Sequence, residues 1–98
     1  MDATDVRRTL QAHREMFQQY GVQEVRVFGS TVRGEACEGS DIDLLVDYDP
    51  SVRVGLFAFV RLRRTLSELL GCPVDLATPD ALHPALRDGI LREAVRVA

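Results

Sequence analysis

Apolar side chains recur every three or four residues in the first part of the chain, the spacing of one helix face. The residues that set this spacing are Val6, Leu10, His13, Phe17 and Tyr20. Gly21 follows and is suited to end the helix, because glycine readily adopts a left-handed conformation. Residues 22–28 are rich in β-branched and aromatic side chains, which predicts a strand.

The middle of the chain reads as a loop, a strand and a helix. Residues 29–40 contain three glycines and two serines, which predicts a loop or a short helical turn. Residues 41–48 read as a second strand, closed by Asp49-Pro50. Residues 55–70 then show helical spacing, and Gly71 follows as a stop. The side chains expected to form the core face of this helix are Leu56, Phe59, Val60, Leu66 and Leu69.

A short strand and a helix complete the pattern. Residues 73–77 predict the third strand, and Pro84 suits the first turn of a final helix. One face of that helix is expected to carry Leu86, Ile90, Ala94 and Val97. Without repeats, linkers or low-complexity segments, the order predicts one α/β or α+β unit, a small sheet flanked by helices.

Composition narrows the class of protein. The 98 residues predict a single domain over 1–98, and 46% hydrophobic with 28% charged residues is typical of a globular chain. No apolar run approaches the roughly 20 residues of a membrane span, so the expected compartment is the cytoplasm. Cys37 and Cys72 are single and far apart in sequence, which suggests neither a metal site nor a disulfide framework.

The charged residues exclude several mechanisms. The net charge of −3 does not fit a general nucleic-acid binder. All twelve basic residues are arginines, which rules out a P-loop lysine or a Schiff base. Contacts to phosphate would therefore come from planar guanidinium groups, which bind oxygens bidentately.

Two aspartates occupy alternate positions at the start of the predicted second strand. Alternate side chains share a face, so Asp41 and Asp43 point away from the core-facing Ile42. They lie about 6.5–7 Å apart along the strand. Their carboxylates can converge on two metal ions about 3.5–4 Å apart. Bound cations would also offset the repulsion between the two like charges.

A third aspartate repeats the arrangement in the predicted third strand. Val74 and Leu76 are expected to face the core, which leaves Asp75 on the opposite face. If this strand pairs beside the second, Asp75 joins Asp41 and Asp43. Such a set of hard oxygen ligands indicates Mg²⁺ or Mn²⁺ rather than zinc.

The end of the first strand suggests a phosphate site. Gly29 lets the backbone approach a ligand closely, and Ser30 can donate its hydroxyl. The turn that follows offers free N–H groups, as anion sites at helix N-termini do. Arg33 could reach the same phosphates, although an ion pair with Glu35 or Glu38 is an equal alternative. Together these residues indicate a site for a Mg²⁺–nucleoside triphosphate.

The stretch GSTVRGEACEGSDIDLLV resembles the Gly-Ser…Asp-x-Asp signature of nucleotidyltransferases similar to DNA polymerase β. The ten residues between Ser30 and Asp41 fit that family's loop, and the resemblance continues over residues 55–95. The chain looks like the minimal nucleotidyltransferase (MNT) group, the antitoxin half of type VII-like HEPN/MNT toxin–antitoxin pairs. Val32 stands where alanine is usual, a small change beneath the turn.

The resemblance implies roles for the site residues. Gly29 and Ser30 would bind the triphosphate, Asp41 and Asp43 would hold two Mg²⁺ ions, and Asp75 would be the third carboxylate. Members of this group transfer AMP from ATP to a tyrosine of the HEPN toxin, an RNA-cleaving protein. An enzyme with a protein partner is thus expected, without membrane or direct nucleic-acid binding.

Other interpretations remain. An antitoxin could neutralise its toxin by occlusion alone, or a small molecule could be the acceptor. An EF-hand starting at Asp41 is excluded because Val52 would occupy its twelfth position. Asp47 lies too far along its strand to join the metals and is expected to be merely exposed. The arginines Arg61, Arg63 and Arg64 are expected to form the solvated face of their helix, with binding of a partner as the less favoured alternative.

Overall fold

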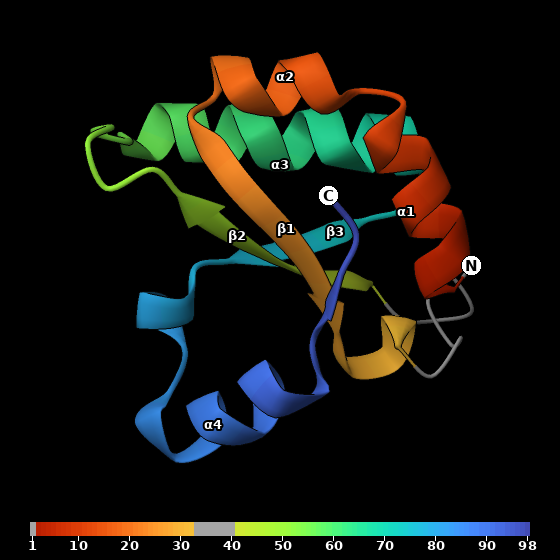
Figure 1. Ribbon diagram of the computed structural model, residues 1–98, viewed down its shortest axis with the longest axis vertical. Helices are drawn as coiled ribbons and strands as arrows, with labels where there is room; N and C mark the ends of the chain where they lie inside the picture. The colour runs from red at the N-terminus through yellow and green to blue at the C-terminus, as the bar shows by residue number, and fades with distance from the viewer. Residues whose placement is uncertain (1, 33–40) are drawn as a thin grey trace.

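The computed structural model of the chain describes residues 2–32 and 41–98. Its elements are α1 (Ala3–Gln11), α2 (Arg14–Gln19), β1 (Val22–Phe28), the 3₁₀ turn η1 (Gly29–Thr31), β2 (Ile42–Tyr48), α3 (Leu56–Leu70), β3 (Val74–Ala77), the 3₁₀ turn η2 (Pro79–Ala81), α4 (Pro84–Glu93) and β4 (Val95–Arg96). The predicted small mixed sheet with flanking helices is confirmed (Figure 1).

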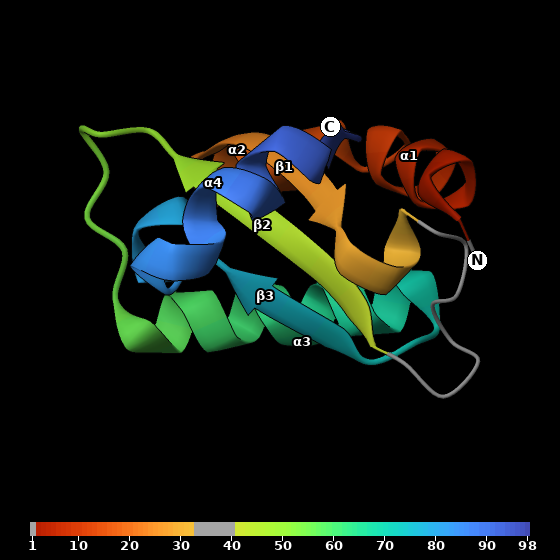
Figure 2. The same ribbon diagram turned by 90° about the horizontal axis from the view of Figure 1, so that it is seen from below.

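The four strands form one sheet in the order β3-β2-β1-β4. β1 runs antiparallel to both β2 and β4, whereas β2 and β3 are parallel. Parallel neighbours need a crossover connection, and α3 supplies it along the sheet (Figure 2). The end of β1 therefore meets the beginnings of β2 and β3 at one edge of the sheet.

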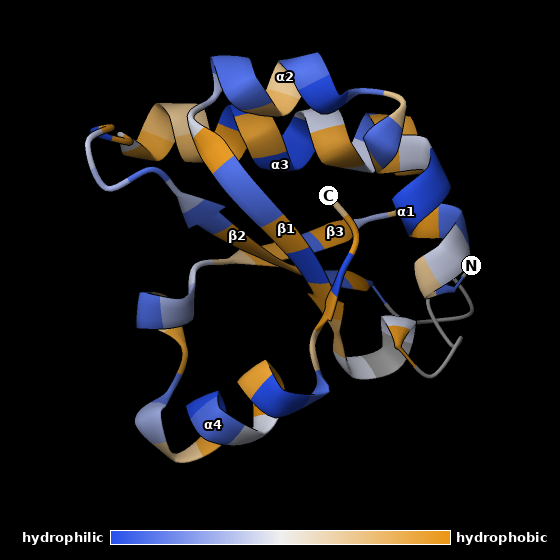
Figure 3. Ribbon diagram, viewed as in Figure 1, coloured by the Kyte–Doolittle hydropathy of each residue, from blue (hydrophilic) through white to orange (hydrophobic). Residues whose placement is uncertain are grey.

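The hydrophobic core lies on one face of the sheet. Helices α1, α2 and α3 cover this face, and α4 lies on the opposite side (Figures 1 and 2). The inward strand residues include Val25, Val27, Ile42 and Leu44, each fully buried. Figure 3 shows mixed apolar and polar colours along β1 and a mostly apolar β2. The predicted core-facing residues of β2 are confirmed, but Leu45, predicted on the opposite face and absent from the core cluster, is also fully buried.

The first helical segment is not one helix, as the spacing predicted, but two. The chain turns at Ala12 and His13, and the exposed His13 precedes α2. The turn places Phe17 of α2 against the same core that buries Val6 of α1. A tight turn between two helices that share one core leaves the apolar spacing intact, so the pattern could not reveal it.

The final helix is shorter than predicted. It ends at Glu93, and Val97, expected on its inner face, lies instead in extended chain beside β1. The Val97 N–H donates to the Val25 carbonyl at 2.9 Å, and the Val25 N–H donates to the Ala98 carbonyl at 3.0 Å. A strand of two residues is too short to show a period of its own, so β4 was missed.

Helix α3 has the predicted extent, and its inner face agrees with the prediction in part: Leu66 is buried and Phe59 packs against the core, as expected. Its buried residues are Leu62, Leu66 and Leu70. Leu56, expected in the core, is 74% exposed, and Val60 is 37% exposed. Nearly every turn of this helix carries more than one apolar side chain, so spacing alone did not select the stripe that packs on the sheet.

Cys72 differs from the sequence-based expectation. The residue is buried and takes part in a disulfide, while Cys37 lies outside the described residues. Sequence separation says little here, because a disulfide depends only on how closely the fold brings two Cα atoms. Among the described residues, no helix combines the length and apolar character needed to cross a bilayer.

Candidate active site at the Gly29 turn

The register of the strands brings two of the predicted carboxylates side by side. Asp43 of β2 pairs with Asp75 of β3, and on the other side Asp43 pairs with Phe28 of β1. Neighbouring strands are about 4.8 Å apart, so Asp43 and Asp75 occupy adjacent positions on the same face. The Ile42 N–H donates to the Pro73 carbonyl at 2.9 Å and fixes the start of β2 beside β3.

Gly29 lies directly against Asp43. Its φ of +61° belongs to the left-handed region, and a Cβ atom there would come within 2.5 Å of the Asp43 Oδ2 atom. Both the backbone conformation and the close carboxylate therefore require glycine. The atom that Gly29 approaches is thus a carboxylate oxygen of the protein itself, and the predicted approach of this backbone to a phosphate stays a prediction.

Thr31 joins the turn to the strand that carries Asp43. It is fully buried, and its Oγ1 accepts a hydrogen bond from the Asp43 N–H at 3.2 Å. This bond links η1 to the beginning of strand β2. It therefore holds the Gly29 turn close to the residue that carries the Asp43 carboxylate. Sequence reasoning missed Thr31, since a threonine within a polar loop gives no signal of burial.

The remaining predicted residues are Asp41, Ser30 and Arg33. Asp41 is exposed and precedes β2 by one residue, two positions before Asp43. Ser30 lies in η1 between Gly29 and Thr31. Arg33 lies outside the described residues, so its predicted contact with phosphate stays a prediction.

The carboxylates of the site are suited to a divalent metal ion. Carboxylate oxygens are the ligands that Mg²⁺ and Mn²⁺ prefer, and Asp43 and Asp75 are neighbours on one face. Within residues 2–32 and 41–98, however, no three acidic, histidine or cysteine side chains converge closely enough to form a closed metal centre. The residues thus fit the cations in chemistry and in strand position, because Asp43 and Asp75 are register partners on neighbouring strands.

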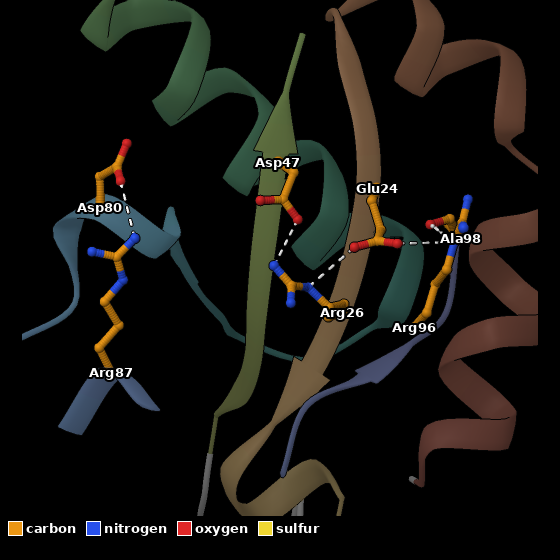
Figure 4. A network of polar contacts seen from close by, with 7 residues as sticks. All are labelled: Glu24, Arg26, Asp47, Asp80, Arg87, Arg96 and Ala98. Atoms are coloured by element: carbon orange, nitrogen blue, oxygen red, sulfur yellow. Dashed lines mark hydrogen bonds and ion pairs between the residues drawn. The ribbon is translucent and has the colours of Figure 1, made fainter. Parts of the chain in front are cut away.

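Asp47, expected to be merely exposed, belongs to an ionic network on the same face of the sheet (Figure 4). Its side chain is 29% exposed, and Arg26 Nη2 donates to its Oδ2 at 2.8 Å. Arg26 Nε lies 3.3 Å from Glu24 Oε2 as an ion pair without hydrogen-bond geometry, and Arg96 lies 3.4 Å from Glu24. The alternation of side chains predicted the face but not the partner, because Arg26 lies on another strand.

Three comparisons with known proteins agree with this geometry. A family model described as "Nucleotidyltransferase domain" matches residues 6–97. The protein adenylyltransferase MntA of Thermococcus cleftensis is 43% identical over 95% of this chain and 93% of its own. A solved structure assigned as a minimal nucleotidyltransferase is 41% identical, with a TM-score of 0.78 over 97% of this chain and 95% of that one.

A more distant likeness concerns the fold alone. The MNT antitoxin solved in complex with a tri-AMPylated HEPN toxin of Shewanella oneidensis has a TM-score of 0.65 at 18% identity. The similarity covers 95% of this chain and 71% of that one.

Proposed function

The chain belongs to the nucleotidyltransferase domain family, and from that premise we propose that it is a protein adenylyltransferase that neutralises a HEPN toxin. It transfers AMP from ATP to a hydroxyl group of the toxin. The resemblance to the MNT group implies that this hydroxyl belongs to a tyrosine. The observation that carries the proposal is the pairing of Asp43 with Asp75 beside the Gly29 turn. The adenylyltransferase relative, similar over nearly its whole length, supports the adenylyl group as the one transferred.

In the proposed reaction one bond to the α-phosphorus forms, one breaks, and one proton is transferred. The oxygen of the acceptor hydroxyl attacks the α-phosphorus of ATP, the bond from that phosphorus to the bridging oxygen breaks, and pyrophosphate leaves in line. The proton of the hydroxyl passes to a carboxylate, a role we assign to Asp75 because it is the exposed member of the paired strands. Such a base must lie within hydrogen-bonding reach of the hydroxyl.

The other residues of the site bind and orient the nucleotide and its metal ions. Gly29 and Ser30 hold the triphosphate through the turn, which the buried Thr31 fixes against β2. Arg33 is proposed as a further phosphate contact. Asp41, Asp43 and Asp75 would hold two Mg²⁺ ions, or Mn²⁺. Such ions, when bound, neutralise the triphosphate and the charge that develops on the leaving group.

Intact-mass spectrometry tests this proposal. A purified HEPN-domain toxin is incubated with the chain, ATP and Mg²⁺. Its mass is expected to rise by one or more AMP units. Asp75→Asn should bind the toxin as the wild type does, because the change is isosteric, and should leave its mass unchanged. An unmodified toxin that wild type and variant neutralise equally would instead establish occlusion as the mechanism.

A further inference from the structure

The exposed apolar side chains of the protein are concentrated in one place. Across residues 2–32 and 41–98, the large hydrophobic residues that stand exposed are Val52, Leu56, Phe57, Val60 and Leu86. All but Leu86 lie within nine residues of one another, at the beginning of α3 and in the segment before it. Phe57 is 85% exposed, the highest value of the set. Figure 3 shows this end of α3 in apolar colours.

Helix geometry places basic side chains next to this apolar group. Phe57 lies three residues before Val60 and four before Arg61, and Arg64 lies four and three residues after these two, so all four share the outer face of α3. The inner face is held by the leucines of the core. The outer face of α3 is therefore apolar in its first turns and basic in the next ones.

The charge of this surface is of one sign. Residues 50–67 contain four arginines, at 53, 61, 63 and 64, and no acidic residue, although the whole chain has a net charge of −3. A hollow of about 540 Å³ opens beside it, between the end of α2 and the start of α3. Its charged lining residues are Arg53 and Arg61, and α2 contributes the uncharged Gln18 and Gln19.

Solvation alone does not explain this arrangement. A solvated helix face needs no aromatic side chain, and contiguous exposed apolar residues rimmed by charges are typical of protein interfaces. Aromatic and arginine side chains are also the residues that most often dominate binding energy at such interfaces. For Arg61, Arg63 and Arg64 these features favour the alternative of partner binding over a merely solvated face.

We propose that Val52, Leu56, Phe57 and Val60, with Arg53, Arg61, Arg63 and Arg64, form a docking surface for an acidic protein partner. We call these residues the α3 patch. The partner offers an apolar depression for Phe57 and carboxylates for the arginines. The inference rests on the proposed function for the identity of this partner, which is the toxin that accepts AMP. Nucleic acid would match the arginines but not the four apolar side chains.

The position of the α3 patch separates binding from chemistry. β2 begins next to Asp75 and runs away from it, and the α3 patch follows its far end (Figures 1 and 2). Asp43 and Tyr48 are five residues apart, about 17 Å in an extended strand. A toxin held at the α3 patch thus leaves the Gly29 turn free for ATP. Loss of the patch should raise the KM for the toxin and leave kcat unchanged.

Binding and transfer measured in parallel test this inference. The probe is the same purified HEPN-domain toxin, titrated by calorimetry against wild type, Phe57→Ser and the double variant Arg63→Glu/Arg64→Glu. We expect each variant to raise the Kd at least tenfold, as the loss of a central anchor does. The double variant should also remove most of the salt dependence. Matched controls on α4, Leu86→Ser and Arg92→Glu, should stay within twofold, since they alter exposed residues of the same types elsewhere.

Thermal melts of every variant confirm that each is folded. Unchanged Kd values for both α3 variants would overturn the docking surface, even if the toxin gains AMP. A patch-dependent complex without AMP transfer would uphold the surface and refute the proposed function. No binding by the wild type would refute both. A single-stranded RNA that binds as tightly as the toxin, and loses affinity in Phe57→Ser, would overturn the choice of a protein partner.

Discussion

At the scale of single residues, the site depends on contacts between Asp43 and the turn before it. Gly29 makes room for the carboxylate, and Thr31 accepts the backbone N–H of the same residue at 3.2 Å. The Gly-Ser pair and the three aspartates were evident from residue types and spacing. The Thr31 contact was not, because burial of a loop hydroxyl depends on how the turn folds back on β2.

Thr31 gives a first prediction. Thr31→Val removes the acceptor and leaves the part-buried Asp43 N–H without this bond, which we expect to cost about 1–3 kcal/mol of unfolding free energy. Transfer activity should fall at least tenfold, because the turn and the carboxylate are no longer fixed to each other. Thr31→Ser keeps the hydroxyl and should retain most of the activity. Denaturant unfolding and initial rates measure both, and equal losses of activity in the two variants would contradict the role of the hydrogen bond.

Tyr48 gives a second prediction. The side chain is half-buried, but its hydroxyl oxygen is shielded from solvent and has no hydrogen-bond partner. Burial also raises the pKa of this phenol, with a smaller contribution from Tyr20. Tyr48→Phe removes the unsatisfied hydroxyl and should leave stability unchanged or raise it by about 1 kcal/mol. Tyr20→Phe is the control in the same unfolding experiment. A clear loss of stability in Tyr48→Phe alone would mean that the hydroxyl is satisfied in solution.

At the scale of elements, the sequence predicted which segments form helices and strands better than how they end. Strands β1, β2 and β3 and helix α3 were found within a residue or two. The break at His13 was missed because α1 and α2 pack on one core and keep one spacing. β4 was missed because its two residues are defined by pairing with Arg26 and Val27 rather than by their own pattern.

Two glycines give a prediction at this scale. Gly89 lies within α4, and a Cβ there would contact nothing within 4 Å. Gly89→Ala should therefore stabilise the helix by about 0.5–1 kcal/mol through helix propensity. Gly21 has a φ of +74°, and a Cβ there would lie 2.9 Å from Val52 Cγ1. Gly21→Ala should therefore destabilise the protein. Melting temperatures of the two variants should move in opposite directions, and a fall for Gly89→Ala would mean that a close contact forms there in solution.

At the scale of the whole molecule, charge sets the conditions for binding ATP. The chain has a net charge of −3 and no lysine, and Asp43 and Asp75 lie together at the site. We therefore predict that ATP binds at least tenfold more weakly without Mg²⁺ or Mn²⁺, because the carboxylates repel the triphosphate. Calorimetric titration with metal and in EDTA measures the two affinities. Equal affinities would contradict a site in which a cation joins the carboxylates to the nucleotide.

The sequence alone did not determine whether β3 pairs with β2, and the position of Asp75 depends on that pairing. Asp75 could join Asp43 only if β3 lay beside β2, and the sheet order places it there in register. The α3 patch could not be predicted from the spacing of apolar residues, because the same spacing also fits a face that packs in the core. Its exposure depends on which stripe of α3 the sheet covers.

The transfer of label from ATP to the toxin tests the central claim most directly. The HEPN-domain protein is incubated with the chain and Mg²⁺ in the presence of ATP labelled at the α-phosphate or at the γ-phosphate. The account predicts that the toxin acquires the α-label and not the γ-label, and that Asp43→Asn abolishes the transfer while remaining folded. Incorporation of the γ-label, or an unlabelled toxin that is nonetheless neutralised, would contradict it.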